Sequence, residues 1–467
     1  MSKISTLLAG VVFFSLFTVV AGAGQSDLVA NTAIDGPVLK FDWPDIEIGI
    51  GSYEEGPTGV TVIRFAKRAS LAIDVRGGSP GTVNTDVLRL AYSLPMWDAV
   101  VLSGGSAYGE ETVTAVATGL KDNGERSAKL SNLANVTGAI IYDFTLRFNE
   151  IYPDKRLAQA ALHALRGGVF PLGAQGAGRM ATQGSFLGCY AHSGQGAAFR
   201  QLGQTKIAAF VVVNALGAVT DRAGNLVKCQ RAKSWGGVTK ISEFLQHLPD
   251  SLSPEWSEPA AKTPIDAPRD KNTTIGLVVT NEALDYAALQ RLAVQVHTSM
   301  ARAIQPFSTQ FDGDVLFSAS TQEVHGNPKL NSQPGGLSPT LGAIAAETMW
   351  DAILASVPKE QAFVASSATV APNVLEAYAG EYVFGPDARL SVKVDHDRLL
   401  IQSMGEGPIF EFVKNAPVPV LPMSETDFYV DGRYHTHIEF IKDSQGRVSG
   451  AVLNPGRWAQ KGKKSSE

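Results

Sequence analysis

The stretch Lys271-Asn-Thr-Thr-Ile-Gly-Leu-Val-Val-Thr-Asn281 decides how the rest of the chain is interpreted. It follows a polar segment studded with prolines, and the apolar, β-branched run that begins at Thr273 predicts a buried strand. Threonine at the head of a strand is ordinary, because threonine favours strands. The alternative is that the chain breaks itself between Asn272 and Thr273. Thr273 would then be a new N-terminus that carries both a nucleophilic hydroxyl and a basic amine. This stretch alone favours the ordinary strand.

The composition is that of a soluble globular protein. The chain has 467 residues, of which 44% are hydrophobic and 18% charged, and its formal net charge is −5. Such a length can build a large core and a second, smaller domain. The mild acidity and the lack of a lysine- or arginine-rich face argue against nucleic-acid binding. No zinc or calcium loop is visible, so we expect neither a metal nor another cofactor.

The first 23 residues have the features of a secretory signal. Lys3 gives a positive start, residues 7–20 form an apolar run, and Ala21-Gly-Ala23 fits a cleavage site. The run is shorter than the ~20 residues that span a bilayer. We therefore expect a periplasmic or secreted protein with no membrane segment after the signal is removed. In that oxidising compartment Cys189 and Cys229 can form a disulfide, although two buried thiols fit equally well.

The middle of the chain alternates strands and helices. Residues 206–213 predict a strand that a turn joins to a second strand near 217–224, as in a hairpin. The strand that starts at Thr273 is followed by Asn281, a favourable N-cap for a helix to about residue 304. An alanine-rich helix is predicted at 337–356. This order predicts sheets covered by helices, a layered α/β sandwich.

The C-terminal part has a different pattern. Residues 360–372 are rich in alanine, serine and valine and predict a linker, and 373–456 predict short strands that form a small all-β barrel. The lysine-rich residues 457–467 predict a disordered tail. His435 and His437 would face the same side of a strand, so a metal pair is conceivable, but a solvent-facing strand edge is favoured.

Asp312-Gly-Asp314 is the clearest acidic pair in the core. By itself it fits a charged turn between a helix and a strand. If the segment is extended, both carboxylates point to one side, because side chains alternate along a strand. Two such anions need a cation or hydrogen-bond donors nearby. The free ammonium and hydroxyl of a liberated Thr273 would supply both, which connects the two signals.

A glycine turn, Ser103-Gly-Gly-Ser-Ala-Tyr-Gly109, joins a predicted strand to a helix. It contains no GxxxxGK[ST] or GxGxxG phosphate motif and no G-x-S-x-G elbow around Ser106. We therefore assign Gly104, Gly105 and Ser106 to packing and to the wall of a substrate site. Ser356-Val-Pro-Lys359 is no S-x-x-K nucleophile, because its proline would prevent the lysine from lying one helical turn above the serine.

Seven short motifs together resemble a known family. The chain resembles the aminopeptidases of family S58, which include the L-aminopeptidase/D-esterase, the β-peptidyl aminopeptidases and the nylon-oligomer amide hydrolases. The motifs occur in family order between about residues 45 and 356. They are Thr58-Gly-Val-Thr-Val, Asp74-Val-Arg-Gly-Gly-Ser-Pro-Gly-Thr, Ser103-Gly-Gly-Ser-Ala-Tyr-Gly, Ile141-Tyr-Asp, Val213-Asn-Ala-Leu-Gly, Asn272-Thr-Thr-Ile and Phe311-Asp-Gly-Asp.

The resemblance implies an autoprocessed, N-terminal-nucleophile-like hydrolase with a four-layer αββα sandwich. The precursor would be cleaved into an α part, residues 24–272, and a β part, residues 273–359. The Asn272-Thr273 junction looks most like that of the nylon-oligomer hydrolases, since the aminopeptidase branch uses serine. The substrate would be a small peptide or an ω-amino-acid amide, and several αβ units would assemble into an oligomer.

The resemblance also implies roles for individual residues. Thr273 matches the nucleophile, and Asn214 matches the amide that binds the oxyanion. Tyr142 would line the site, and Asp312 with Asp314 would orient Thr273.

One position departs from the family pattern. The family usually has a lysine before a Gly-Gly-x-Gly turn, and here His192 occupies that slot, where it would contact substrate with a different charge near pH 7. This leaves open a second interpretation, a secreted binding protein that is never processed and uses the family core as a scaffold. Residues from Leu375 onward resemble a β-barrel appended to some serine β-lactamase-like hydrolases, so an esterase of that kind is a third interpretation.

Overall fold

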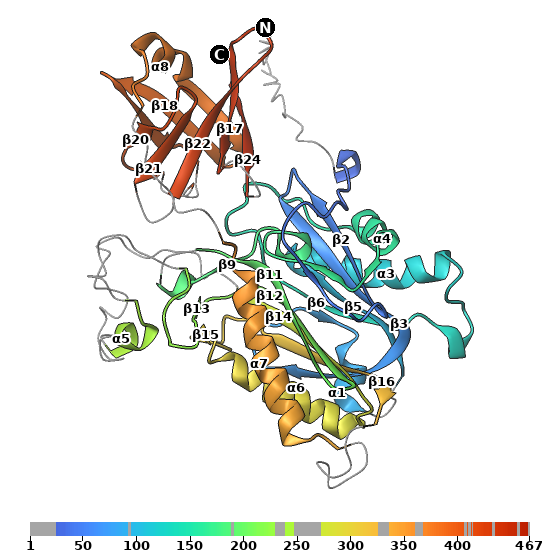
Figure 1. Ribbon diagram of the computed structural model, residues 1–467. Helices are drawn as coiled ribbons and strands as arrows, with labels where there is room; N and C mark the ends of the chain where they lie inside the picture. The colour runs from blue at the N-terminus through green and yellow to red at the C-terminus, as the bar shows by residue number, and fades with distance from the viewer. Residues whose placement is uncertain are drawn as a thin grey trace, which may run out of the picture.

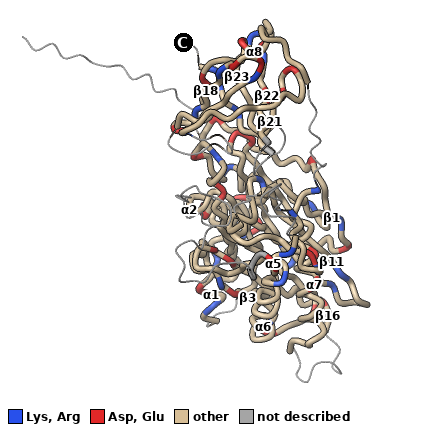
Figure 2. The backbone as a smooth tube through the Cα atoms, turned by 90° about the vertical axis from the view of Figure 1, so that its left-hand side faces the viewer, with Lys and Arg blue, Asp and Glu red and all other residues tan. Residues whose placement is uncertain are grey.

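The structure is a computed structural model. It describes residues 25–91, 95–187, 191–228, 239–246, 272–325, 336–359, 368–405, 409, 412, 414–431, 435–454 and 458–465. The predicted signal, both cysteines and most of the predicted linker lie outside these residues. Figure 1 shows a large α/β core with a separate β-barrel above it. Basic and acidic residues are interspersed along the described chain (Figure 2).

One ten-stranded sheet folds into the two inner layers of the core. The long strand β3 (Thr58–Val75) runs through both layers. Beside its N-terminal half lie β2 (Ile46–Tyr53), β4 (Thr82–Val83), β5 (Trp97–Ser103), β6 (Val136–Ile140) and β7 (Arg166–Gly167). Beyond its C-terminal half lie β16 (Val315–Val324), β14 (Thr273–Glu282), β12 (Thr205–Asn214) and β11 (Gly194–Leu202).

Helices form the two outer layers. In Figure 1, α3 (Glu111–Asp122) and α4 (Lys155–His163) lie on the side of β2 and β5. The other outer layer consists of α6 (Tyr286–Met300) and α7 (Pro339–Ser356), which pack on β3, β11, β12 and β16. Short elements complete the core: α1 (Thr85–Leu90), α2 (Ser106–Gly109), α5 (Ile241–Gln246), β1 (Val38–Lys40), β8 (Val169–Pro171), β9 (Thr182–Gln183), β10 (Ala191–His192), β13 (Ala218–Val219), β15 (Ile304–Gln305), and the 3₁₀ turns η1 (Gln25–Asp27), η2 (Leu130–Asn132), η3 (Gly176–Gly178) and η4 (Ser185–Leu187).

Three apolar cores separate the four layers. Alternate residues of a strand face opposite sides of its sheet. On β3, Val62 therefore packs against α3 and α4, whereas Ile63 packs between the two sheets. On β12, Val212 packs between the sheets, and Val211 packs against α6 and α7. This arrangement confirms the predicted αββα sandwich.

Two local predictions in the core are wrong. Asn281 does not cap a helix: it lies within β14, where its side chain accepts from the Lys206 amide at 2.7 Å and donates to the Gln204 carbonyl at 2.8 Å. Helix α6 begins later, with Asp285 as its N-cap. The predicted hairpin after residue 206 also does not form. Strand β12 pairs with β11 and β14, and β13 pairs instead with β15.

The C-terminal domain is a closed barrel of eight strands, which confirms the predicted β-barrel. Helix α8 (Pro372–Tyr378) precedes it and contributes Leu375 to the barrel core. The strands are β17 (Gly380–Gly385), β18 (Ala388–Asp395), β19 (Arg398–Ser403), β20 (Val418–Pro422), β21 (Asp427–Asp431), β22 (His435–Lys442), β23 (Val448–Leu453) and β24 (Gln460–Lys464).

The predicted disordered tail is wrong for residues 460–464, because β24 closes the barrel between β23 and β17. Gln460 and Gly462 are buried, whereas Lys461 and Lys463 are exposed. The tail was predicted to be disordered because it is rich in lysine. In the structure these lysines lie on the exposed face of a strand, where side chains alternate between the two faces. Within the described residues, no helix is both long and apolar enough to cross a membrane.

Candidate active site

Three strand ends bring the predicted site residues together. Thr273 is the first residue of β14, and Asn214, the last residue of β12, lies directly opposite it. On the other side of β14 runs β16, and the bridge between Asn272 and Asp312 continues that pairing toward the site. Because the register is fixed by long ladders on both sides, these residues are held in place by the sheet itself.

The peptide bond before Thr273 has an unusual environment. The Thr273 hydroxyl donates to the Asn272 carbonyl oxygen at 2.5 Å. The backbone N–H of Gly313 donates to the same oxygen at 2.8 Å. Asn272 and Thr273 are each only 4% exposed. A hydroxyl thus lies beside a buried carbonyl whose oxygen already accepts a backbone donor, as an oxyanion site requires.

Gly313 was not identified from the sequence, although it is the middle residue of Asp312-Gly-Asp314. A Cβ at this position would lie 2.7 Å from Thr273 Oγ1 and 2.8 Å from the Ser79 carbonyl oxygen. Such distances are shorter than carbon and oxygen tolerate, so only glycine brings this backbone so close to the threonine. The only sequence signal is the glycine between two aspartates.

The two aspartates are buried beside the junction. Asp314 accepts from the Thr274 amide at 2.6 Å and from the Ser308 amide at 2.9 Å. Asp312 accepts at one oxygen from the Thr309 amide at 2.9 Å and from the Thr309 hydroxyl at 2.6 Å. Asp314 is therefore joined to the residue after Thr273. In the uncut chain Asp314 thus supports the threonine through its backbone neighbour, whereas Asp312 is hydrogen-bonded to Thr309 and Leu216.

Burial and mutual repulsion change the protonation of this pair. Burial, followed by the charge of Asp312, raises the pKa of Asp314 to about 8. Burial also raises the pKa of Asp312. The backbone amides that bond to both carboxylates act in the opposite direction, but burial outweighs them, so the uncut chain holds a proton on this pair near neutral pH. A cation released nearby would favour ionisation of both groups.

A loop packs its backbone against the aspartate segment. The amides of Arg76 and Gly77 donate to the Asp314 carbonyl at 3.1 and 3.2 Å, and the Ser79 amide donates to the Asp312 carbonyl at 2.9 Å. A Cβ on Gly77 would lie 2.1 Å from the Asp314 nitrogen. The glycine at position 77 therefore allows the backbone of this loop to approach the aspartate segment closely.

A buried histidine, His297, holds the start of the loop that follows β3 through a contact with Asp74. Asp74, at the end of β3, contacts His297 Nδ1 at 3.0 Å. Burial lowers the pKa of His297 below its usual range, which favours the neutral imidazole at pH 7. Neither residue was assigned a role from the sequence.

Asn214 is fixed at both ends of its amide. Its oxygen accepts from the Thr182 amide at 3.1 Å, and its nitrogen donates to the Tyr142 carbonyl at 2.8 Å. The side-chain nitrogen carries two hydrogens, so one N–H remains besides the one that binds the Tyr142 carbonyl. Tyr142 therefore supports Asn214 through its carbonyl, while its ring packs edge-on against Phe144 with centroids 5.7 Å apart.

The glycine turn is held behind Tyr142 by a buried ion pair. Asp143 accepts from the Gly105 amide at 2.9 Å and pairs with Arg147 at 2.7 Å. A Cβ on Gly104 would lie 2.4 Å from the Asp143 carboxylate. The Ser106 amide donates to a carbonyl next to Tyr142, that of Ile141, at 3.0 Å. Gly104, Gly105 and Ser106 thus pack behind the segment after β6 that carries Tyr142.

His192 lies on the far side of Asn214. It is paired with Thr182 between β10 and β9, and Thr182 is the residue whose amide binds Asn214. Its imidazole stacks on the indole of Trp458, which comes from the barrel, with centroids 3.8 Å apart and planes 16° apart. This contact between the two domains was not predicted from the sequence.

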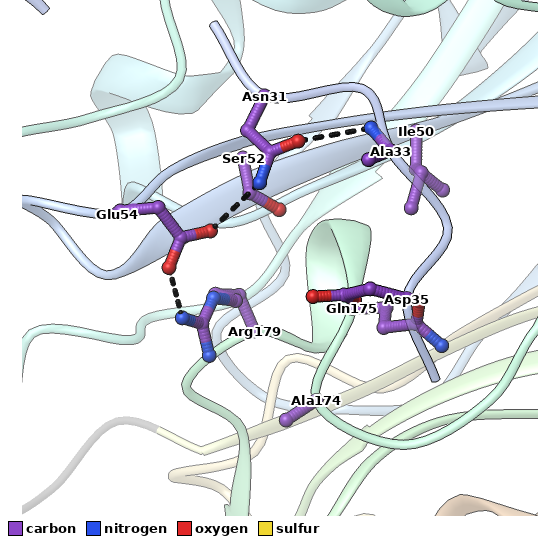
Figure 3. Close-up of a pocket in the computed structure, with 9 residues that line it drawn as sticks. All are labelled: Asn31, Ala33, Asp35, Ile50, Ser52, Glu54, Ala174, Gln175 and Arg179. Atoms are coloured by element: carbon purple, nitrogen blue, oxygen red, sulfur yellow. Dashed lines mark hydrogen bonds and ion pairs between the residues drawn. The ribbon is translucent and has the colours of Figure 1, made fainter. Parts of the chain in front are cut away.

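A separate polar pocket of about 280 Å³ lies between the N-terminal segment, β2 and the loop that contains η3. Figure 3 shows Arg179 in this pocket, paired with Glu54 at 2.5 Å. The lining residues include none of the predicted site residues. Within the described part of the chain, no group of three or more histidine, cysteine, aspartate or glutamate side chains is placed to hold a metal ion.

Comparisons with known proteins agree with the motifs. A sequence model of Peptidase family S58 matches residues 41–370. The chain is 38% identical to a 6-aminohexanoate-oligomer endohydrolase of Paenarthrobacter ureafaciens over 337 residues, which cover 71% of this chain and 90% of that protein. It is 35% identical to an uncharacterized aminopeptidase of Mycobacterium leprae over 331 residues, 67% of this chain and 85% of that protein. Among solved structures, the L-aminopeptidase D-Ala-esterase/amidase from Ochrobactrum anthropi matches with a TM-score of 0.48 and 15% identity, covering 70% of this chain and 88% of that one.

Proposed function

Because the chain belongs to peptidase family S58, we propose that it is an amide hydrolase that first cleaves itself between Asn272 and Thr273. The observation that carries this proposal is the environment of one carbonyl. The Asn272 oxygen accepts from the Thr273 hydroxyl at 2.5 Å and from the Gly313 amide at 2.8 Å. A nucleophile and an oxyanion donor thus meet at the same buried peptide bond.

Self-cleavage would proceed by an N-to-O acyl shift. Thr273 Oγ1 bonds to the Asn272 carbonyl carbon, the C–N bond breaks, and the hydroxyl proton moves to the departing nitrogen. Water then hydrolyses the ester, which leaves a carboxylate on Asn272 and restores the hydroxyl of Thr273. The Gly313 amide stabilises the oxyanion in both steps. The products are an α part, residues 24–272, and a β part, residues 273–359, followed by the barrel.

The same threonine would then act on substrates. Its free amine has an ordinary pKa of roughly 7.7–8.0, so a large fraction is neutral and can take the hydroxyl proton near neutral pH. In the protonated form, the amine is a cation next to Asp312 and Asp314, which favours their ionised forms. The uncommitted N–H of Asn214 would bind the substrate oxyanion. An acyl-enzyme forms on Thr273, and water releases the acid.

The substrate would be a peptide or an amide of an ω-amino acid. One relative is named a 6-aminohexanoate-oligomer endohydrolase and others are named aminopeptidases, and both names describe hydrolysis of unactivated amides. We also propose that the enzyme acts outside the cytoplasm after its signal is removed, and that αβ units assemble into an oligomer.

Hydrolysis by matched variants tests this function. Wild-type protein is expected to hydrolyse amino-acid p-nitroanilides or a linear 6-aminohexanoate tetramer. Thr273→Ala should hydrolyse neither, whereas Thr273→Ser should retain activity. Folded wild-type protein that hydrolyses none of these amides would favour the binding-protein interpretation, which the unusual His192 supports.

A further inference from the structure

The barrel contacts the core beside the candidate site. Trp458, two residues before β24, stacks on His192 with ring centroids 3.8 Å apart. It is 9% exposed and packs in a small cluster with Ala174, Met180 and Leu146, all from the core. Trp458 therefore packs against residues of the core, although it lies in the part of the chain that forms the barrel.

The strand register places His192 near Thr273. Gly194 of β11 lies opposite Val213 of β12, and the next residue of β12, Asn214, lies opposite Thr273 of β14. Neighbouring strands are about 4.8 Å apart, so positions two strands apart are separated by roughly 10 Å. His192 lies two residues before Gly194, just beyond this row. A substrate that extends roughly 10 Å past Thr273 on the Asn214 side would therefore approach the His192–Trp458 stack.

A second contact fixes the barrel against the loop that contains Leu146 and Phe148. Gln460 of β24 accepts from the Phe148 amide at 3.1 Å and donates to the Leu146 carbonyl. A Cβ on Gly385 would lie only 1.8 Å from the Phe148 carbonyl oxygen, so the two domains touch backbone to backbone. The contacted loop continues from Tyr142, which supports Asn214. The barrel therefore contacts His192 and also the loop that follows Tyr142.

Trp458 also has an unused donor. Its indole Nε1 is buried and has no hydrogen-bond partner among the described residues. Buried donors are rarely left unmatched, and an acceptor brought by a ligand satisfies one. An indole edge with a single N–H suits a chain in which methylene groups alternate with amide carbonyls.

We propose that Trp458 is a specificity-determining residue of the substrate site, through which the barrel selects extended oligoamides over single-amide substrates. The inference rests on the proposed function. The aliphatic part of the substrate packs along the His192–Trp458 stack, and a carbonyl beyond the scissile amide accepts from the indole. A substrate with only one amide reaches Thr273 without using this wall.

The test compares two substrates on full-length protein. Trp458→Ala should raise KM for the linear 6-aminohexanoate tetramer about fivefold, the usual size of an aromatic contact. The variant should change KM for an amino-acid p-nitroanilide less than twofold, with kcat nearly constant for both. Trp458→Phe keeps most of the ring and loses the N–H, and its effect should be smaller in the same direction. Met404→Ala, an exposed position of the barrel, is the matched control.

The outcomes separate this inference from the proposed function. A folded, self-cleaved Trp458→Ala enzyme whose KM changes equally for both substrates, or for neither, overturns the inference alone. If that variant does not fold, Trp458→Phe is judged by the same criterion. Wild-type protein that hydrolyses neither substrate overturns the proposed function and the inference with it.

Discussion

Substitution of Gly313 by alanine tests the chemistry of self-cleavage. The added Cβ would lie 2.7 Å from Thr273 Oγ1, whereas ordinary contacts begin at 3.4 Å. The backbone must therefore retreat by about 0.7 Å, which stretches the 2.8 Å hydrogen bond to the Asn272 carbonyl to about 3.5 Å. Gly313 is not among the glycines with positive φ, so alanine is acceptable to the backbone itself. The perturbation is steric and local.

Loss of one oxyanion donor typically lowers a rate by about 10²–10³. We expect Gly313→Ala to cleave itself at least about 100-fold more slowly than wild type, with a stability loss of roughly 1–3 kcal/mol from overpacking. The assay follows conversion of one chain into two on denaturing gels after synthesis in a cell-free system. Thermal unfolding of the same samples reports stability.

Gly119→Ala is the control for overpacking alone. Its Cβ would lie 2.7 Å from a Leu162 methyl group in the outer core, away from the junction. This variant should cleave itself at the wild-type rate. If folded Gly313→Ala also cleaves itself at the wild-type rate, the backbone amide of Gly313 has no part in the reaction.

Three further predictions concern the same residues. Thr273→Val keeps the shape of the side chain but lacks the hydroxyl, so intact mass should show one uncut chain, and two chains would remove the hydroxyl from its proposed role. Asn214→Ala should lower kcat for a p-nitroanilide by about 10²–10³ while KM changes little, because the lost donor acts on the oxyanion; a change confined to KM would contradict this. The raised pKa of Asp314, about 8 in the folded chain, means that its ionisation destabilises the uncut fold. The Tm of Thr273→Val should therefore fall as the pH rises from about 4 to 8, and the added change Asp314→Asn should flatten that slope; identical slopes would contradict the assignment.

Sequence patterns identified features that are local or periodic. The buried strand from Thr273 was predictable from its β-branched run, and the barrel from regularly spaced short strands. Asn281 was misassigned because asparagine serves equally well as a helix cap and as a substitute for backbone partners at a strand end. The lysines of β24 concealed a strand, since one face of a barrel strand is free to be charged.

The features of the site that were missed depend on contacts between distant segments. Nothing in Asp312-Gly-Asp314 indicates that the Gly313 amide binds the Asn272 carbonyl, since that contact requires the pairing of β14 with β16. The Trp458 stack on His192 requires the barrel to fold and dock. Composition and spacing carry no information about either.

The central claim is that the bond before Thr273 is broken by the residue that follows it. Intact mass and N-terminal sequencing of purified wild-type protein test it most directly. Two chains are expected, the second of which begins with unmodified Thr273. A single folded chain that is continuous through residues 272 and 273 would contradict it.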